Sequence, residues 1–169
     1  MILDTAIDVI TFAYYDSPIG VLKIGGTDLY ISQISFAENE TNPEEQSTET
    51  PAIIHDCIEQ LIEYFAGNRQ TFDLPIHQDG TEFQEKVWGK LSEIPFGSTM
   101  SYGELAKKMG DPKVVRAAAA ANGKNPILIV IPCHRVLGSD GSLTGFSAGI
   151  WRKKWLLAHE NPVKQKTFF

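Results

Sequence analysis

A cysteine and a histidine stand side by side in this sequence, directly after an unbroken run of apolar residues. The run spans residues 127–131, and Pro132, Cys133 and His134 follow it. A thiol has an ordinary pKa of about 8.5 and becomes a useful nucleophile only where a base or a positive group stabilises its thiolate. A third group normally orients the base, and Glu160 is a candidate for that role. These residue types fit nucleophilic catalysis by Cys133, although neighbours in sequence do not necessarily bring their side chains together.

A metal site is the alternative reading of the same residues. His55, Cys57, Cys133 and His134 together supply four soft or borderline ligands. The spacing argues against this site, because residues two apart on a helix point in different directions. Cys133 and His134 also lack the gap of two to four residues that is typical of a zinc knuckle. We therefore expect no metal and no cofactor.

The segment before the apolar run predicts short helices. Thr81 with Gln84 and Ser101 with Glu104 have the spacing of capping boxes, which mark helix starts. Gly110 ends the second of these helices, and Asp111-Pro112 opens a third, which extends to about residue 122. Two short helices joined by a tight glycine-containing turn are typical of a helix-turn-helix motif.

Five consecutive alanines, residues 117–121, give this third helix an almost flat surface. Small side chains let a helix backbone approach another surface closely, which suits either helix packing or nucleic-acid binding. Arg116 precedes the alanines and favours DNA.

The first part of the chain predicts an antiparallel meander followed by one helix. Apolar residues alternate over 7–15, 21–24 and 29–36, which indicates three strands. A helical stripe of apolar residues follows Pro51 and includes Cys57, which we interpret as core. Residues 72–76 are a candidate fourth strand. The fold class is therefore α+β, with a domain boundary near Gly80 that separates residues 1–80 from residues 81–169.

Charge is distributed very unevenly between these two domains. The net charge is -6, but residues 1–80 hold two basic side chains against fourteen acidic ones, and residues 81–169 hold thirteen basic against seven acidic. Only the second domain, with a net charge of +6, suits a phosphate backbone, although two ordinary solvated surfaces would also explain the asymmetry. Two cysteines in different contexts favour a reducing, cytoplasmic location without a disulfide. We expect neither a signal peptide nor a membrane span.

Most of the chain resembles the O6-alkylguanine-DNA alkyltransferases, also called methylated-DNA-protein-cysteine methyltransferases. The matching segments are Tyr15–Gly20, Thr81–Gln84, Val87–Trp88, Ile94–Gly97, Ser101–Ala106, Arg116–Ala117, Asn122–Pro126 and Pro132–Val136. The resemblance implies a ribonuclease-H-like N-terminal α/β domain and a mainly helical C-terminal domain. It also implies DNA repair by a monomer whose helix-turn-helix binds the minor groove of double-stranded DNA and flips the damaged base out of the stack.

By the same resemblance, Cys133 accepts the alkyl group from O6-alkylguanine, and from O4-alkylthymine, once per molecule. His134 then acts through a water as the base, Glu160 orients His134, Asn125 supports the active-site turn, and Tyr102 donates to the departing base.

The resemblance also assigns a DNA surface and a base pocket. The DNA surface comprises Arg116, Ala117, Ala119, Ala120, Asn122, Gly123, Lys124 and Arg135. The base pocket comprises Tyr102, Val136, Phe146 and Ser147, with the main-chain carbonyls of residues 133 and 136.

This chain departs from the family pattern at three positions. Ala118 and Ala119 stand where relatives often have valine and glycine, and Phe146 stands where many have tyrosine. Two other functions remain open at this point, a non-catalytic protein that binds alkylated DNA and a cysteine hydrolase that uses Cys133, His134 and Glu160.

Overall fold

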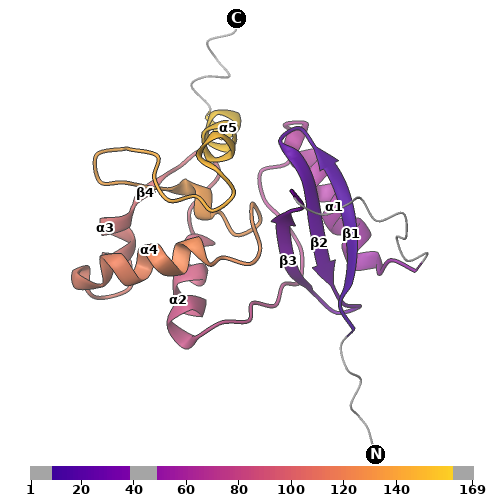
Figure 1. Ribbon diagram of the computed structural model, residues 1–169, viewed down its shortest axis with the longest axis horizontal. Helices are drawn as coiled ribbons and strands as arrows, with labels where there is room; N and C mark the ends of the chain where they lie inside the picture. The colour runs from indigo at the N-terminus through magenta and orange to yellow at the C-terminus, as the bar shows by residue number, and fades with distance from the viewer. Residues whose placement is uncertain (1–8, 39–48, 162–169) are drawn as a thin grey trace, which may run out of the picture. The chain divides into compact units, whose positions relative to one another are not determined.

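The computed structural model describes residues 9–38 and 49–161 of the chain. It divides into two compact units, Met1–His77 and Gln78–Phe169. Figure 1 shows strands in the first unit and mainly helices in the second, which confirms the α+β fold class. Ile7, near the start of the first expected strand, lies outside the described residues.

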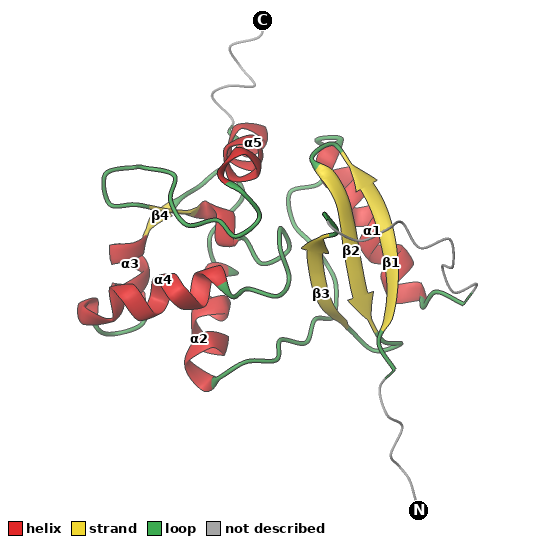
Figure 2. Cartoon of the chain, in the orientation of Figure 1, coloured by secondary structure: helices red, strands yellow, loops and turns green. Residues whose placement is uncertain are grey.

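The first unit is a three-stranded antiparallel sheet that packs against one helix. The strands are β1 (Thr11–Ser17), β2 (Gly20–Gly26) and β3 (Ile31–Phe36), paired in that order. Helix α1 (Ala52–Phe65) contacts all three strands and packs along one face of the sheet (Figure 2). Cys57 on α1 is fully buried, which confirms its core position. The expected strand at residues 72–76 is reduced to a single parallel bridge between Ile31 and Ile76.

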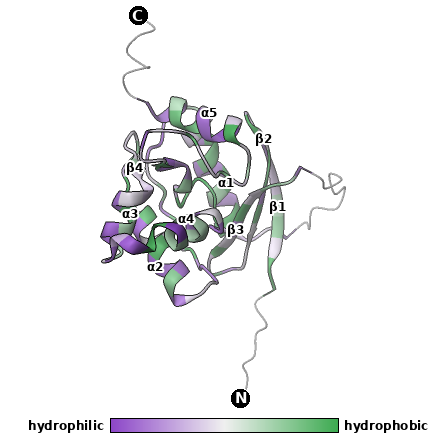
Figure 3. Cartoon of the chain, turned by 60° about the vertical axis from the view of Figure 1, so that its left-hand side comes forward, coloured by the Kyte–Doolittle hydropathy of each residue, from purple (hydrophilic) through white to green (hydrophobic). Residues whose placement is uncertain are grey.

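Within its described residues, 78–161, the second unit is built from four α-helices and short connecting elements. In chain order, these elements are α2 (Glu82–Leu91), β4 (Met100–Ser101), α3 (Tyr102–Lys108), the 3₁₀ turn η1 (Pro112–Val114), α4 (Val115–Gly123), the 3₁₀ turn η2 (Cys133–Arg135), β5 (Val136–Leu137) and α5 (Ile150–Glu160). Helices α2, α3 and α5 each carry both hydrophobic and hydrophilic residues (Figure 3), as expected of amphipathic helices that turn their apolar face toward the core.

Helix capping fixes where α2 and α3 begin. The Thr81 hydroxyl accepts from the Gln84 backbone N–H, and the Gln84 side chain accepts from the Thr81 N–H, which confirms the predicted capping box. Ser101 caps α3 through the backbone N–H of Glu104. After α3, Gly110 adopts a φ of 95°, which is favourable for glycine, and the chain turns into η1 and α4.

The two helices α3 and α4 pack against each other and against α2. Trp88 of α2 is buried and donates its indole N–H to the carbonyl of Ala121 on α4 at 2.9 Å. This contact fixes the buried side of α4 and leaves its other side at the surface. Among residues 9–38 and 49–161, no helix is both long and apolar enough to cross a membrane.

Candidate active site

The apolar run before Cys133 is a tightly turned loop that is largely buried. Two backbone hydrogen bonds join residues two apart, as in γ-turns. The Val130 N–H donates to the Leu128 carbonyl and the Cys133 N–H donates to the Ile131 carbonyl, both at 2.8 Å. Ile129 lies inside the first of these turns with a φ of 71°, a conformation that strains a β-branched residue. The loop therefore delivers Cys133 on a sharply bent backbone that other contacts must hold in place.

Asn125 supplies those contacts. Its side-chain amide donates to the Ile131 carbonyl at 2.7 Å, and its side-chain oxygen accepts from the Ile127 N–H at 3.0 Å. Both hydrogen bonds are buried, so each stabilises the bent loop more than a solvent-exposed bond would.

The Cys133 thiol at the start of η2 is almost completely buried. Burial raises its pKa to about 11, while the Asn125 side chain, the positive charge of Lys153 and nearby backbone N–H groups partly offset this effect. The thiol is therefore protonated at neutral pH in the free protein, and a base must accept its proton before or during attack.

His134 and Glu160 are joined by a hydrogen bond within the core of the second unit. The distance from His134 Nε2 to Glu160 Oε2 is 2.8 Å, and the two side chains are 0% and 2% exposed. Arg135 binds the same carboxylate, with Nε 2.7 Å from Oε1 and Nη2 3.0 Å from Oε2. Glu160 is the last residue of α5, and this helix places its carboxylate next to η2, although Glu160 follows Arg135 by 25 residues in the sequence.

The protonation states of this cluster follow from its contacts. Burial raises the pKa of Glu160, but the hydrogen bonds from His134 and Arg135 and the positive charge of Arg135 outweigh it and lower the pKa to about 2, so the carboxylate is negative. Burial lowers the pKa of His134 below its ordinary value, despite the opposing effect of Glu160. A neutral His134 that donates Nε2–H to Glu160 leaves Nδ1 as an acceptor, and this buried atom has no hydrogen-bond partner among the described residues.

Two residues assigned to the DNA surface lie inside the protein instead. Arg135 is 6% exposed, and it also donates from Nη1 to the Ile94 carbonyl at 2.7 Å. Its assignment as a DNA contact is wrong, because the guanidinium is occupied by the Glu160 carboxylate and this carbonyl. Asn122 is 1% exposed, and its amide lies 3.4 Å from the Cys133 carbonyl, so the DNA assignment of Asn122 fails for the same reason of burial.

The rest of the predicted DNA surface follows α4. Arg116, Ala117, Ala120, Gly123 and Lys124 are exposed and Ala119 is half-buried. Ala118 is fully buried, so its departure from the family pattern affects packing inside the unit rather than the exposed side of α4.

Sequence reasoning missed Lys153, a buried lysine at the centre of the site. Its ammonium group donates to the Val136 carbonyl at 2.6 Å and to the Thr144 carbonyl at 3.0 Å. Burial lowers its pKa, and the nearby Cys133 thiolate would raise it. The signal in the sequence was a lysine on the apolar stripe of the last helix, one turn before Leu156 and Leu157.

Tyr102 lies beside the same group. Its hydroxyl donates to the Thr144 carbonyl at 3.2 Å, and the Lys153 ammonium lies 5.8 Å from its ring centroid. Burial and the neighbouring Cys133 raise the pKa of Tyr102, while hydrogen bonds to Asn122 and Thr144 partly offset this, so the phenol stays a proton donor at neutral pH.

The remaining predicted pocket residues differ in exposure. Val136 and Phe146 are buried, whereas Ser147 is exposed. The two carbonyls assigned to base recognition already accept hydrogen bonds, that of Cys133 from Asn122 and that of Val136 from Lys153. The Cys133 carbonyl also accepts from the Val136 backbone N–H, so both of its lone pairs are occupied unless the 3.4 Å contact with Asn122 gives way to a base.

The described residues contain no group of three or more potential metal ligands. His55 and Cys57 lie on α1 in the first unit, whereas Cys133 and His134 belong to the second. Burial raises the pKa of Cys57 to about 12, and no neighbouring group opposes that effect, in contrast to Cys133.

Two family models match this chain. The "6-O-methylguanine DNA methyltransferase, ribonuclease-like domain" matches residues 10–78, and the corresponding "DNA binding domain" matches residues 82–162. The two matches follow one another along the chain.

Curated relatives match over nearly the whole length. The methylated-DNA–protein-cysteine methyltransferase of Mycolicibacterium paratuberculosis is 44% identical over 152 residues, 89% of this chain and 92% of that protein. The protein of the same name from Methanosarcina acetivorans is 40% identical over 151 residues, 88% of this chain and 97% of the relative.

Solved structures of methyltransferases also match this chain over nearly its whole length. A crystal structure of Mycobacterium tuberculosis O6-methylguanine methyltransferase matches with a TM-score of 0.80 and 39% identity, covering 95% of this chain and all of that one. The same organism's OGT in complex with DNA matches with a TM-score of 0.79 and 39% identity over 94% of this chain and 99% of that chain. With both family models matched in sequence order and relatives of 40% identity or more over most of its length, this chain belongs to the 6-O-methylguanine-DNA methyltransferase family.

Proposed function

We propose that this protein repairs DNA by moving the alkyl group of O6-alkylguanine onto the sulfur of Cys133, once per molecule. The observation that carries this proposal is the buried Cys133 thiol next to the His134–Glu160–Arg135 cluster, in a chain of this family. The relatives named above are methyltransferases that transfer a methyl group from methylated DNA to a protein cysteine. Cys133 lies within residues 82–162, which match the family's DNA binding domain.

The unpartnered Nδ1 of His134 gives the thiol proton a destination. Glu160 holds the opposite nitrogen of the ring, so the imidazole presents a lone pair rather than an N–H at Nδ1. In our proposal the proton passes from the thiol through a water to Nδ1, and the adjacent carboxylate stabilises the imidazolium that forms.

Transfer itself is a single displacement. A bond forms between the Cys133 sulfur and the alkyl carbon while the bond from that carbon to O6 of guanine breaks, and the bonding electrons leave with guanine. The Tyr102 phenol donates a proton to the departing base, and the proton held by His134 then returns through water to the Tyr102 phenolate, so guanine ends with the equivalent of the proton that the thiol lost. Lys153 lies near enough to Cys133 to favour the thiolate electrostatically, as its effect on the thiol pKa indicates.

The product limits each molecule to one reaction. A thioether is not a substrate for the neighbouring histidine or for water, and the acceptor thiol is consumed. We infer that the exposed side of α4, led by Arg116, contacts the minor groove of duplex DNA and that the target base enters the site between Tyr102 and Phe146. We propose that the protein acts as a monomer, and that it also accepts O4-alkylthymine as a smaller base of similar chemistry.

Peptide mapping tests the acceptor. The full-length protein is incubated with a duplex that carries one O6-methylguanine, digested, and analysed by tandem mass spectrometry. The proposal expects a methyl group on the peptide that contains Cys133 and none on the peptide that contains Cys57. A methyl group on Cys57, or an unmodified protein that still binds the duplex, would reject Cys133 transfer, and the second result would favour a protein that only binds alkylated DNA.

A further inference from the structure

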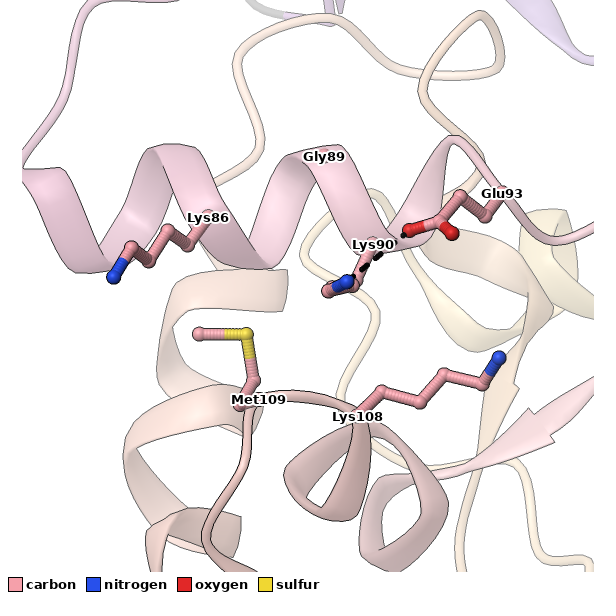
Figure 4. A pocket seen from close by; sticks show the side chains of 6 residues that line it. All are labelled: Lys86, Gly89, Lys90, Glu93, Lys108 and Met109. Atoms are coloured by element: carbon pink, nitrogen blue, oxygen red, sulfur yellow. Dashed lines mark ion pairs between the residues drawn. The ribbon is translucent and has the colours of Figure 1, made fainter.

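We propose that a groove between α2 and the end of α3 binds phosphates of the DNA backbone. This inference rests on the proposed function, because it adds a second contact surface to the same duplex. The groove has a volume of about 460 Å³, and we call it the basic groove. Its lining residues are Lys86, Gly89, Lys90, Glu93, Lys108 and Met109 (Figure 4).

The charges of the basic groove are only partly balanced. Lys90 forms an ion pair with Glu93 at 3.6 Å, whereas neither Lys86 nor Lys108 pairs with a carboxylate of the described residues. Lys86 and Lys90 lie four residues apart on α2, a spacing at which like charges repel and destabilise a helix. An anion between these side chains would remove that repulsion.

The helix dipole explains Lys108 but not Lys86, whose favourable neighbour on the helix is Glu82, four residues before it. Lys107 and Lys108 occupy the last turn of α3, where positive charges stabilise the helix dipole. Lys86 lies in the middle of α2, where the dipole gives it no such benefit. Lys86 lines the groove together with Met109, and its side chain runs along α2 while the Met109 side chain points up toward that helix (Figure 4).

The shape of the groove leaves room for a phosphate. Gly89 lies between the two lysines of α2, and a Cβ atom placed there would meet no atom within 4 Å. The groove wall at this point is bare backbone, so an oxyanion can approach both lysines without displacing a side chain.

Continuity with the proposed DNA surface favours DNA as the source of the anion. Lys108 and Met109 end the first helix of the helix-turn-helix, and this helix crosses the DNA backbone in proteins that use the motif. The exposed Lys113 in the turn links the groove to Arg116 at the start of α4. Lysine contacts to phosphates add affinity that does not depend on the DNA sequence, which suits a protein that must search any DNA. These contacts would also offset the repulsion between DNA and a protein with a net charge of -6.

The test measures how the affinity of the full-length protein for an undamaged duplex depends on salt. Fluorescence anisotropy is recorded at several sodium chloride concentrations for wild type and for Lys86→Gln/Lys108→Gln. Each lost phosphate contact lowers the magnitude of the slope of log K against log salt by about 0.9. We therefore expect the variant's slope to be smaller by about 1.8 and, with equal affinities at about 1 M, its affinity near 0.1 M salt to be lower by about 60-fold. Glu93→Gln, which frees Lys90, should tighten binding.

A matched control removes the same number of charges elsewhere. Lys23→Gln/Arg69→Gln takes both basic side chains from residues 1–80 and should leave the slope unchanged. Transfer from the free base O6-benzylguanine, which has no phosphate, should be the same in every variant.

The outcomes separate the two proposals. If wild type transfers the alkyl group from DNA but the groove variant keeps the wild-type slope, or if the control pair lowers the slope equally, the basic groove is not a phosphate site. If wild-type Cys133 accepts an alkyl group neither from the free base nor from DNA, the proposed function itself is overturned.

Discussion

At the scale of single residues, the site combines a thiol that burial disfavours as an anion with a histidine that burial keeps in its neutral form. Burial raises the pKa of Cys133 to about 11 and lowers the pKa of His134. Both shifts keep the free protein neutral at these two positions near pH 7. The thiol is therefore protected from adventitious reaction until a substrate displaces solvent and the proton moves.

This arrangement predicts the ionisation state of Cys133 in the free protein. With cysteine labelled with carbon-13 at Cβ, the Cys133 chemical shift should stay at its thiol value from pH 7 to pH 9, because the pKa lies near 11. The signal of Cys57, whose pKa is about 12, is an internal reference that should also remain unchanged. A Cys133 midpoint below the ordinary thiol value of about 8.5 would show that the site stabilises a preformed thiolate.

At the scale of secondary-structure elements, α5 and η2 are held together by a buried charge cluster. Glu160 at the end of α5 binds His134 and Arg135 of η2. Removing the carboxylate leaves the buried Arg135 guanidinium without a negative charge beside it, with only the Ile94 carbonyl still accepting from it. We expect Glu160→Gln to lower the free energy of unfolding by about 3–5 kcal/mol. Glu63→Gln, which breaks the exposed pair with Arg69, should change it by less than about 1 kcal/mol.

The same cluster predicts acid sensitivity. The folded-state pKa of Glu160, about 2, lies below its ordinary value of 4.5, so its stabilisation is fully present above that ordinary value and is lost as the pH falls toward 2. Urea unfolding of wild type should show a decline in stability over this pH range that is much smaller in Glu160→Gln. Equal declines in the two proteins would assign acid sensitivity to other carboxylates.

The loop before Cys133 depends on Asn125 in a comparable way. Asn125→Ala removes two buried hydrogen bonds and should cost about 1–3 kcal/mol of stability. Because the strained turn at Ile129 then relaxes, the transfer rate should fall by at least about tenfold, as expected when a nucleophile is misplaced. Single-turnover kinetics with a methylated duplex measure this rate below the unfolding temperature of the variant. A stable variant with the wild-type rate would mean that the loop holds its shape without Asn125.

These elements show how far the sequence can be interpreted without a structure. The spacing of Thr81 and Gln84 predicted a helix start correctly, because capping depends on residues three apart. The apolar run at residues 127–131 is recognisable from the sequence, but its bent backbone depends on the side chain of Asn125, which hydrophobic periodicity does not reveal. Arg135 was misassigned and Lys153 was missed, since their partners at Glu160 and Thr144 are fixed only by the tertiary fold.

At the scale of the whole molecule, each unit holds one buried thiol, and Cys133 differs from Cys57 in having side chains that partly offset the effect of burial on its pKa. Cys57 belongs to the core of α1 and its sheet. Cys57→Ala should lower stability by about 1 kcal/mol and leave the amount of alkyl group transferred per molecule unchanged. Thermal unfolding and quantitative transfer measure the two effects. A reduced transfer capacity in a folded variant would show that the first unit takes part in the reaction.

The central claim is that Cys133 accepts one alkyl group and is consumed, and intact-mass spectrometry tests it most directly. Wild type and Cys133→Ala are incubated with a molar excess of duplex that carries O6-methylguanine, and the masses are followed over time. We predict that wild type gains the mass of one methyl group and no more, while Cys133→Ala gains none. A wild-type mass that stays unchanged while the lesion disappears repeatedly, or methylation that persists in Cys133→Ala, would contradict the account.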